Sequence, residues 1–270
     1  MNEKTRFIEI ISILKNSALI RGFTPQKLCE TIIKLGPTFI KIGQIMSNRY
    51  DLLPKEYCDA LANLRANVTP MDFKEVNQIL KEEFGNPNEI FQNISKNCIG
   101  SASIAQVHKA KLKSGEDVVI KVQRRNIYEI MSTDVKLFKR AIRLLHLNLL
   151  IKIVDLNSVL DEMYNVAKEE MDFEKEAQHL ERFYENQKDV AYVTCPKVYK
   201  EYSNEHLLVM SYVDGIQIDH IEELDRNGYD RKEIAQKTAQ NYCKQILADG
   251  FFHADPHPGN LWISGGQIVW

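Results

Sequence analysis

Apolar side chains recur at helical spacing along most of the chain. Near the N-terminus they follow an i, i+3, i+4, i+7 pattern that places them on one face of an amphipathic helix: Phe7, Ile10, Ile11, Leu14 and Ala18. Thr24 is expected to cap a second helix that has Pro25 in its first position. Further helices are predicted over residues 37–45, 55–64 and 69–84. The N-terminal third is therefore predicted to be helical.

Strand-like patterns occur in two segments. β-Branched and small residues recur from Ile104 to Ile120 on both sides of a turn at residues 113–116, which predicts a β-hairpin within residues 95–123. A second strand pair is predicted within residues 197–213.

The helical pattern returns over residues 126–190 and from Ile216 onward. A helix over residues 230–249 is expected to end at Gly250, because glycine readily adopts the left-handed conformation that terminates helices. The chain is therefore predicted to be an α+β protein in which helix dominates.

Composition narrows the class of protein. Hydrophobic residues make up 44% of the chain and charged residues 27%, which rules out a collagen-like, disordered or disulfide-dense chain. The formal net charge is −2, from 35 basic and 37 acidic side chains, so we expect no nucleic-acid partner. The five cysteines are scattered without a CxxC or Cys/His cluster, which favours reduced thiols over a zinc site.

No segment has the pattern of a signal peptide or a membrane span. Polar residues interrupt the N-terminal apolar run, unlike a secretory signal. The most apolar stretch, Leu147–Val154, is much shorter than the roughly 20 residues that cross a bilayer. We therefore expect a cytoplasmic chain whose association with membranes, if any, is peripheral.

The predicted hairpin carries residues suited to bind phosphate. Gly100–Ser103 at its entrance is a run of small residues, whose backbone N–H groups can come close to phosphate oxygens. Lys121 on the last strand resembles the strand-borne lysine of protein kinases, which contacts the same phosphates. Taken alone, a lysine at the end of a strand is usually part of the solvated surface.

Two polar motifs lie on predicted helices. Lys41, Gly43 and Gln44 fit a solvated helix edge, although glycine inside a helix costs about 1 kcal/mol relative to alanine and so indicates a close approach. The acidic run Glu169–Ala177 fits a solvated helix face.

Within the acidic run, Asp172 and Glu176 are four residues apart and are expected to share one face of a helix. In the functional interpretation, Glu176 is the carboxylate that pairs with Lys121.

The segment 253–260 carries the strongest chemical signal. Its two prolines and one glycine predict a rigid, irregular loop that presents side chains. Asp255 and Asn260 are five residues apart, as are the catalytic Asp and the metal-binding Asn of the kinase loop H-R-D-x-x-x-x-N. The alternatives are a transition-metal site at His253 and His257, or a loop with a structural role only.

Five motifs in this order resemble the UbiB family of atypical, protein-kinase-like proteins associated with ubiquinone biosynthesis. They are Lys41-Ile42-Gly43-Gln44, the Ala-rich loop Ser101–His108, Val119-Ile120-Lys121, Glu170-Met171-Asp172 with Glu176-Ala177, and His253–Asn260. The resemblance begins near Thr24 and runs to the end of the chain. It implies a protein-kinase-like fold with an N-terminal helical extension, a small antiparallel-sheet N-lobe and part of a helical C-lobe. The expected domains are 1–92, 93–213 and 214–270.

The resemblance also implies a set of site residues. The expected catalytic residues are Lys121, Glu176 and Asp255, and Asn260 is the expected Mg²⁺ ligand. Nucleotide-binding residues are expected in the Ala-rich loop, in the lobe connector and in the extension with its acidic partners: Ser101, Ala102, Ser103, Ala105, Met210, Tyr212, Lys41, Gln44, Glu170 and Asp172. The cofactors implied are ATP and Mg²⁺.

The family resemblance further implies an ATPase or small-molecule kinase. Isoprenoid or quinone lipids and a membrane surface are the partners expected besides adenine nucleotide. The extension is expected to cover the active site and to contact the acidic residues of the Glu170–Asp172 motif.

The turn Ser264–Gln267 should precede a metal-binding D-F-G aspartate, but the sequence ends at Trp270. We therefore expect weak or absent ATP turnover, and a protein partner over the incomplete C-lobe. The alternatives are a nucleotide- or lipid-responsive pseudokinase module without catalysis, an inactive fragment that lacks the D-F-G aspartate, and a helical scaffold that binds no nucleotide.

Overall fold

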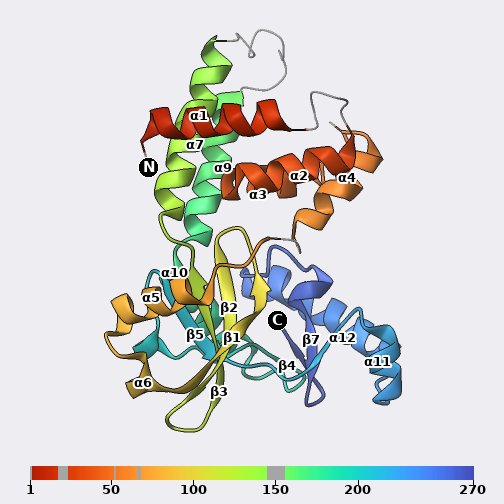
Figure 1. The fold of residues 1–270 in the computed structure, drawn as a ribbon. Coiled ribbons are helices and arrows are strands. Elements are labelled where there is room, and N and C mark those ends of the chain that lie inside the picture. The colour runs from red at the N-terminus through yellow and green to blue at the C-terminus, as the bar shows by residue number, and fades with distance from the viewer. Residues whose placement is uncertain (1, 18–23, 52, 66–67, 145–155) are drawn as a thin grey trace. The chain divides into compact units, whose positions relative to one another are not determined.

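The computed structural model describes residues 2–17, 24–51, 53–65, 68–144 and 156–270 (Figure 1). Ala18 and the apolar stretch 147–154 of the sequence analysis lie outside these residues. The chain forms two compact units, each assembled from three segments. Unit 1 comprises Met1–Pro87, Ser95–His108 and Lys121–Asp172, and unit 2 comprises Asn88–Ile94, Lys109–Ile120 and Phe173–Trp270.

Unit 1 is mainly helical. Its helices are α1 (Glu3–Asn16), α2 (Pro25–Leu35), α3 (Pro37–Met46), α4 (Lys55–Ala62), α5 (Phe73–Phe84), α7 (Ile127–Leu144) and α9 (Leu156–Glu170). Local signals set their ends as predicted. The Thr24 hydroxyl accepts the Lys27 N–H at the start of α2, and Gly36, at φ 98°, separates α2 from α3.

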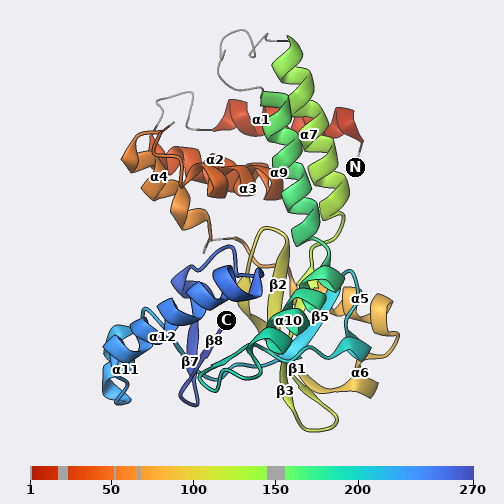
Figure 2. The same cartoon turned by 180° about the vertical axis from the view of Figure 1, so that it is seen from behind.

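The helices of unit 1 pack through apolar side chains. α2, α3 and α4 enclose a cluster around Ile40, Leu61 and Leu64. The long helices α7 and α9 lie side by side in both views (Figures 1 and 2). No helix among the described residues is both long enough and apolar enough to cross a membrane.

The first sheet has the strand order β1-β2-β3-β5. Its strands are β1 (Phe91–Ser101), β2 (Ala105–Leu112), β3 (Asp117–Gln123) and β5 (Leu207–Ser211). The hairpin β2–β3 and its turn at residues 113–116 are confirmed, and Gly115, at φ 106°, supplies the positive φ that the turn needs. The strand β1, which the short helix α6 (Pro87–Ile90) precedes, was not predicted. Most of its side chains are at least partly exposed, so it has no clear apolar alternation.

Unit 2 combines helices with a second sheet. Its helices are α10 (Phe173–Gln187), α11 (Ile221–Arg226), α12 (Arg231–Lys244) and a π-helical turn, η4 (Gln245–Asp249). Its second sheet has the order β4-β8-β7-β6, from β4 (Val193–Thr194), β8 (Gln267–Val269), β7 (Trp262–Ser264) and β6 (Ile216–Gln217). Gly250, at φ 58°, ends the helical segment as predicted.

Four expectations for the second half of the chain need correction, and three of them concern strands. The helical pattern expected from Ile216 is wrong at its start, because β6 pairs with β7. The second sheet as a whole was missed, since strands of two or three residues are too short to show a period. Of the strand pair predicted within residues 197–213, Leu207–Met210 is present in β5, whereas Val198 makes only a single bridge to Met210.

The fourth correction concerns the acidic run, which does not form one helix. The chain leaves helical geometry at Met171 and Asp172, between α9 and α10. The Met171 carbonyl accepts from the Gln123 amide (2.5 Å), and the Phe173 N–H donates to the Glu205 carbonyl (3.3 Å). Asp172 therefore lies outside the helix that carries Glu176, and the two do not share one helix face.

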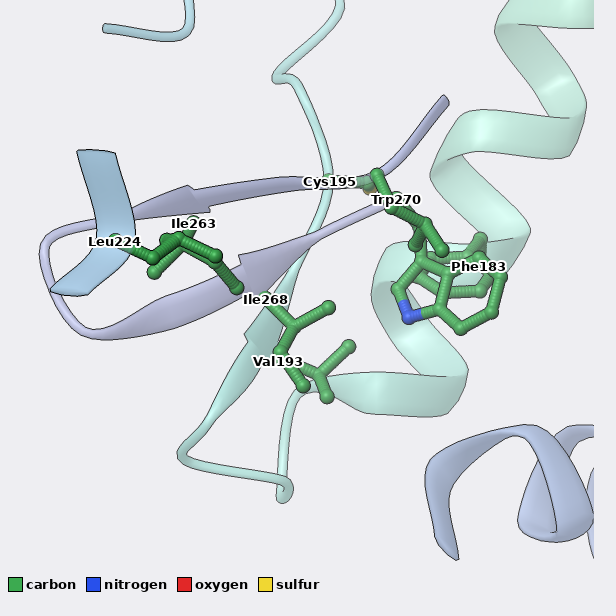
Figure 3. Close-up of a cluster of buried hydrophobic side chains, with 8 residues drawn as sticks. Phe183, Val193, Cys195, Leu224, Ile263, Ile268 and Trp270 are labelled. Carbon is green, nitrogen blue, oxygen red and sulfur yellow. The ribbon is translucent and has the colours of Figure 1, made fainter. Parts of the chain in front are cut away.

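An apolar cluster connects α10, the second sheet and α11 within unit 2. Its buried members are Phe183, Val193, Cys195, Leu224, Leu261, Ile263, Ile268 and Trp270. Figure 3 shows the Trp270 indole beside the ring of Phe183, and their centroids are 6.3 Å apart. The Tyr242 ring on α12 stacks on the same indole at 5.7 Å and an interplanar angle of 11°. The loop 253–260 adjoins this cluster, because the His253 ring lies 5.9 Å from the Trp270 indole and Leu261 follows the loop directly.

Candidate functional site

The loop 253–260 connects η4 to β7 and is held by its own backbone. The Asp255 carbonyl accepts the His257 N–H (2.8 Å) and the side-chain amide of Asn260 (3.0 Å). The Asn260 N–H donates in turn to the His257 carbonyl (2.8 Å). Pro256 and Pro258 fix two of the φ angles, which restricts the loop further.

This arrangement orients the two residues that the sequence singled out. Because the Asn260 amide nitrogen donates to the Asp255 carbonyl, the amide oxygen is turned away from that carbonyl. The Asp255 and Asn260 side chains are both exposed. The loop thus presents one carboxylate and one amide oxygen to solvent, and oxygen ligands of this kind suit Mg²⁺.

The two histidines of the loop stabilise its backbone. His253 Nδ1 accepts the Asp255 N–H (3.2 Å), and His257 Nδ1 accepts the Gly259 N–H (3.0 Å). Burial lowers the pKa of His253, which keeps Nδ1 available as an acceptor at neutral pH. Among the described residues, no group of three or more His, Cys, Asp or Glu side chains is placed to hold a metal ion.

In unit 1, the Ala-rich loop is closed by a turn and held by an arginine that the sequence analysis missed. The Ala102 N–H donates to the Ala105 carbonyl (2.8 Å). The Arg124 guanidinium donates to the Ala102 carbonyl (3.0 Å), the Ser101 hydroxyl (2.9 Å) and the Thr69 carbonyl (2.8 Å). Ser103 and Ala105 are buried, whereas Ala102 is exposed. Arg124 is a single arginine just after β3 and belongs to no motif, so no sequence signal pointed to this role.

The segment before α5 is also fixed to this loop. The Gln106 side chain accepts the Met71 N–H (2.6 Å) and lies 2.8 Å from His108 Nε2. His108 Nδ1 lies 2.8 Å from the Ser95 carbonyl oxygen, and burial lowers the pKa of His108. Gln106 and His108, the last polar residues of the Ala-rich motif, thus connect β2 to the segment before α5 and to β1.

The structure brings Lys41 on α3 to Glu170 at the end of α9, where they form an ion pair. The contact of the extension with the acidic motif that the resemblance implied is therefore present. The Gln44 amide donates to the Leu64 carbonyl (3.3 Å), and Gly43 is buried. A Cβ at Gly43 would lie 2.5 Å from Leu64 Cδ1, so the close approach indicated by this glycine is confirmed.

The remaining site residues divide between the units. Lys121 lies on β3 in unit 1, whereas Glu176 in the first turn of α10 and Asp255 lie in unit 2. The pairing of Lys121 with Glu176 therefore stays a prediction.

Met210 and Tyr212 lie at and just beyond the end of β5. The Tyr212 N–H donates to the Asp117 carbonyl (3.0 Å), and Lys109 Nζ lies 3.7 Å from the centroid of the Tyr212 ring.

Comparison with known proteins identifies the family of the chain. The chain is 39% identical over 248 residues to a protein from the 5′ region of hydrogenase 1 in Clostridium pasteurianum, and covers 47% of that protein. It is 41% identical over 268 residues to the chloroplastic protein ACTIVITY OF BC1 COMPLEX KINASE 8 of Arabidopsis thaliana, and covers 34% of it. The chain thus spans a third to a half of the length of these relatives.

A solved structure from Mycobacterium tuberculosis, that of the Rv3197–erythromycin complex, has the same fold. It matches 97% of this chain with a TM-score of 0.62 and 25% sequence identity, and 65% of that protein is covered. The expected α+β, kinase-like fold class is therefore confirmed. The family model of the ABC1 atypical kinase-like domain matches residues 63–269, which is most of the chain. The chain belongs to the ABC1 atypical kinase-like family, the UbiB-type family that its five motifs indicated.

Proposed function

We propose that this atypical kinase-like chain contributes an adenine-nucleotide site with Mg²⁺, and that the protein acts as an ATPase or a small-molecule phosphotransferase. The observation that carries the proposal is the geometry of the 253–260 loop. Its backbone hydrogen bonds turn the Asn260 amide oxygen outward and leave the Asp255 carboxylate exposed.

The assigned roles follow from the chemistry of these groups. Mg²⁺, held through the Asn260 amide oxygen, would neutralise charge on the phosphates. The Asp255 carboxylate would orient the attacking hydroxyl group and accept its proton. The small residues of the Ala-rich loop would leave room for the phosphates, and the hydrogen bonds from Arg124 restrain that loop.

Binding of a fluorescent ATP analogue, with and without Mg²⁺, tests this proposal. Lys121→Met should weaken binding about tenfold, because a charge-assisted phosphate contact is lost. Asn260→Ala should remove the Mg²⁺ dependence and leave Mg²⁺-free binding unchanged. Lys113→Met, in the β2–β3 turn, is the matched control. If Lys121→Met folds normally and binds nucleotide as the wild type does, the assignment is wrong.

For the phosphoryl acceptor, we propose an isoprenoid-quinone or lipid-type molecule that reaches the protein at a membrane surface. The support is the family resemblance, together with the structural neighbour solved in complex with erythromycin, a small-molecule ligand. ATP hydrolysis that rises on addition of quinone-containing vesicles, and not of plain vesicles, would support this acceptor class. Equal rates with both vesicles would contradict it.

The same neighbour favours a second candidate function, binding of a small molecule without phosphoryl transfer. Mg²⁺-dependent phosphate release separates the two candidates. Asp255→Asn abolishes release if the protein is an enzyme. Under the second candidate, wild type and variant both bind nucleotide and neither releases phosphate.

A further inference from the structure

A chain of buried amide side chains runs through unit 2 from the last turn of α10 to the loop 253–260. Gln187 on α10 is 2% exposed, and Asn241 on α12 and Gln245 in η4 are both 0% exposed. Gln245 Oε1 accepts the His253 N–H (3.1 Å), and Gln245 Nε2 donates to Asn241 Oδ1 (2.7 Å). Asn241 Nδ2 then donates to Gln187 Oε1 (2.7 Å).

The series of buried amides ends at the carboxylate of Asp249. Gln187 Nε2 donates to Asp249 Oδ2 at 2.8 Å. Asp249 is itself paired with Lys244, whose Nζ lies 2.8 and 2.9 Å from the two carboxylate oxygens. The backbone N–H of His253 therefore starts a series of four hydrogen bonds, and an ion pair completes it.

The two ends of this series fix its direction. A backbone N–H can only donate and an ionised carboxylate can only accept, so every amide between them must accept on the loop side and donate on the Asp249 side. Reversal of one amide would place two donors or two acceptors together in the interior, where an unmade hydrogen bond is costly. The buried series thus fixes the orientation of each amide and holds the His253 N–H through Gln245.

The series reaches Asp255 through His253. The His253 ring accepts the Asp255 N–H (3.2 Å), and its carbonyl accepts the Tyr242 hydroxyl (3.1 Å). Gln245 and Asp249 are the first and last residues of a π-helical turn, a feature that is frequent at functional sites. Gln187, the last amide before Asp249, lies on α10, the helix whose first turn carries Glu176.

We propose that Gln187, Asn241 and Gln245 are positioning residues that join α10 to the loop 253–260, so that Glu176 and Asp255 keep one mutual arrangement. None of the three is among the site residues expected from sequence. The catalytic meaning of this role rests on the proposed function, whereas the mechanical coupling does not.

Hydrogen exchange of the nucleotide-free 270-residue chain tests the coupling directly. Asn241→Leu breaks the series two hydrogen bonds away from the loop. It should speed exchange of the His253 and Asp255 amides about tenfold, because their acceptors are no longer held. Gln187→Met leaves the Lys244–Asp249 pair intact and should speed the exchange of the same two amides. It replaces Asn241→Leu in the test if that variant does not fold. Leu224→Val, a packing change in the core of the same unit, is the control.

Faster loop exchange in the series variants than in Leu224→Val, at matched melting temperature, supports the proposal. Equal exchange in all three variants overturns it. A second measurement concerns whatever Mg²⁺-dependent phosphate release the wild type shows: Asn241→Leu and Gln187→Met should lower its kcat and leave its KM for ATP unchanged. Failure of the wild type to bind nucleotide would refute the proposed function without affecting the exchange result.

Discussion

Arg6 on α1 and Asp134 on α7 form a two-point ion pair in the interior of unit 1. Arg6 Nε lies 2.7 Å from Asp134 Oδ1, and Arg6 Nη2 lies 2.9 Å from Oδ2. The two residues are 4% and 0% exposed. The Thr38 hydroxyl at the start of α3 donates to the same carboxylate (2.6 Å), so Asp134 holds both α1 and α3 against α7.

Asp134→Ala should therefore destabilise the chain strongly. Removing one partner of a buried ion pair leaves the other charge uncompensated, which typically costs about 3–5 kcal/mol. Urea unfolding followed by circular dichroism gives the loss directly. Asp51→Ala, which breaks the exposed Arg49–Asp51 pair, is the control and should have no measurable effect. Equal stability of the two variants would show that the interior pair contributes nothing.

This ion pair marks the limit of what the sequence could predict. Local signals were sufficient for the caps and the turn: Thr24, Gly115 and Gly250 act where they were expected to act. Arg6 and Asp134 are 128 residues apart, and nothing in the local pattern around either residue points to the other.

The candidate site likewise has residues that the sequence could predict and residues that it could not. The motif spacing singled out Lys41, Glu170, Asp255 and Asn260, whose exposed or partly exposed groups carry recognisable chemistry. It missed Arg124 and the buried amide series, because single Arg, Gln and Asn residues inside ordinary segments have no characteristic spacing.

Gly43→Ala should destabilise unit 1 at the packing of α3 against α4. The new methyl group would lie 2.5 Å from Leu64 Cδ1 and 3.4 Å from Leu61 Cδ2, inside the cluster around Ile40. Overpacking of this kind usually costs about 1–3 kcal/mol. Gly100→Ala is the matched control, because its nearest neighbour is 4.0 Å away. A thermal unfolding temperature equal to that of Gly100→Ala would contradict this reading of the glycine.

Stability should fall on mild acidification, because two partly or fully buried histidines bind protons less readily in the folded chain. Burial lowers the pKa of His108 and of His253, whereas histidine in the unfolded chain titrates near its ordinary value of about 6.5. As the pH drops below that value, the unfolded state takes up protons first and the free energy of unfolding decreases. The decrease continues until the lowered folded-state pKa values are passed.

Urea unfolding across this pH range measures how steeply the free energy of unfolding depends on pH, for the wild type and for His253→Asn. Asparagine offers an oxygen acceptor in place of Nδ1 and does not titrate, so the slope should become shallower. Val193→Ala, a core substitution without a titrating group, should lower stability and keep the wild-type slope. A slope unchanged in His253→Asn would mean that this histidine is not the source.

The cysteines should differ in reactivity with a thiol reagent in the folded chain. Burial raises the pKa of the Cys195 thiol to about 11, and its Sγ lies 3.4 Å from the Leu180 carbonyl oxygen. Cys58 is also buried, whereas Cys243 on α12 is exposed. Mass spectrometry after brief alkylation should find Cys243 modified first, and Cys195 only after denaturation. Early labelling of Cys195 would indicate local opening of the cluster around Trp270.

Lys41 and Glu170 should be coupled in their effect on nucleotide binding. Their ion pair fixes α3 to the end of α9, with the side chains 15% and 44% exposed. If the extension controls the site through this pair, Lys41→Met and Glu170→Gln should each change the preference between ATP and ADP. The double variant should change it no further, because either substitution already breaks the contact.

The affinities of the four proteins for ATP and ADP complete this double-mutant cycle. Lys55→Met and Asp59→Asn break a fully surface-exposed pair on α4 and provide the matched control, for which no change in preference is expected. Additive effects of Lys41→Met and Glu170→Gln would show that the two residues act independently. Unaltered binding in both variants would show that the Lys41 motif is an ordinary solvated helix edge, as its sequence alone suggests.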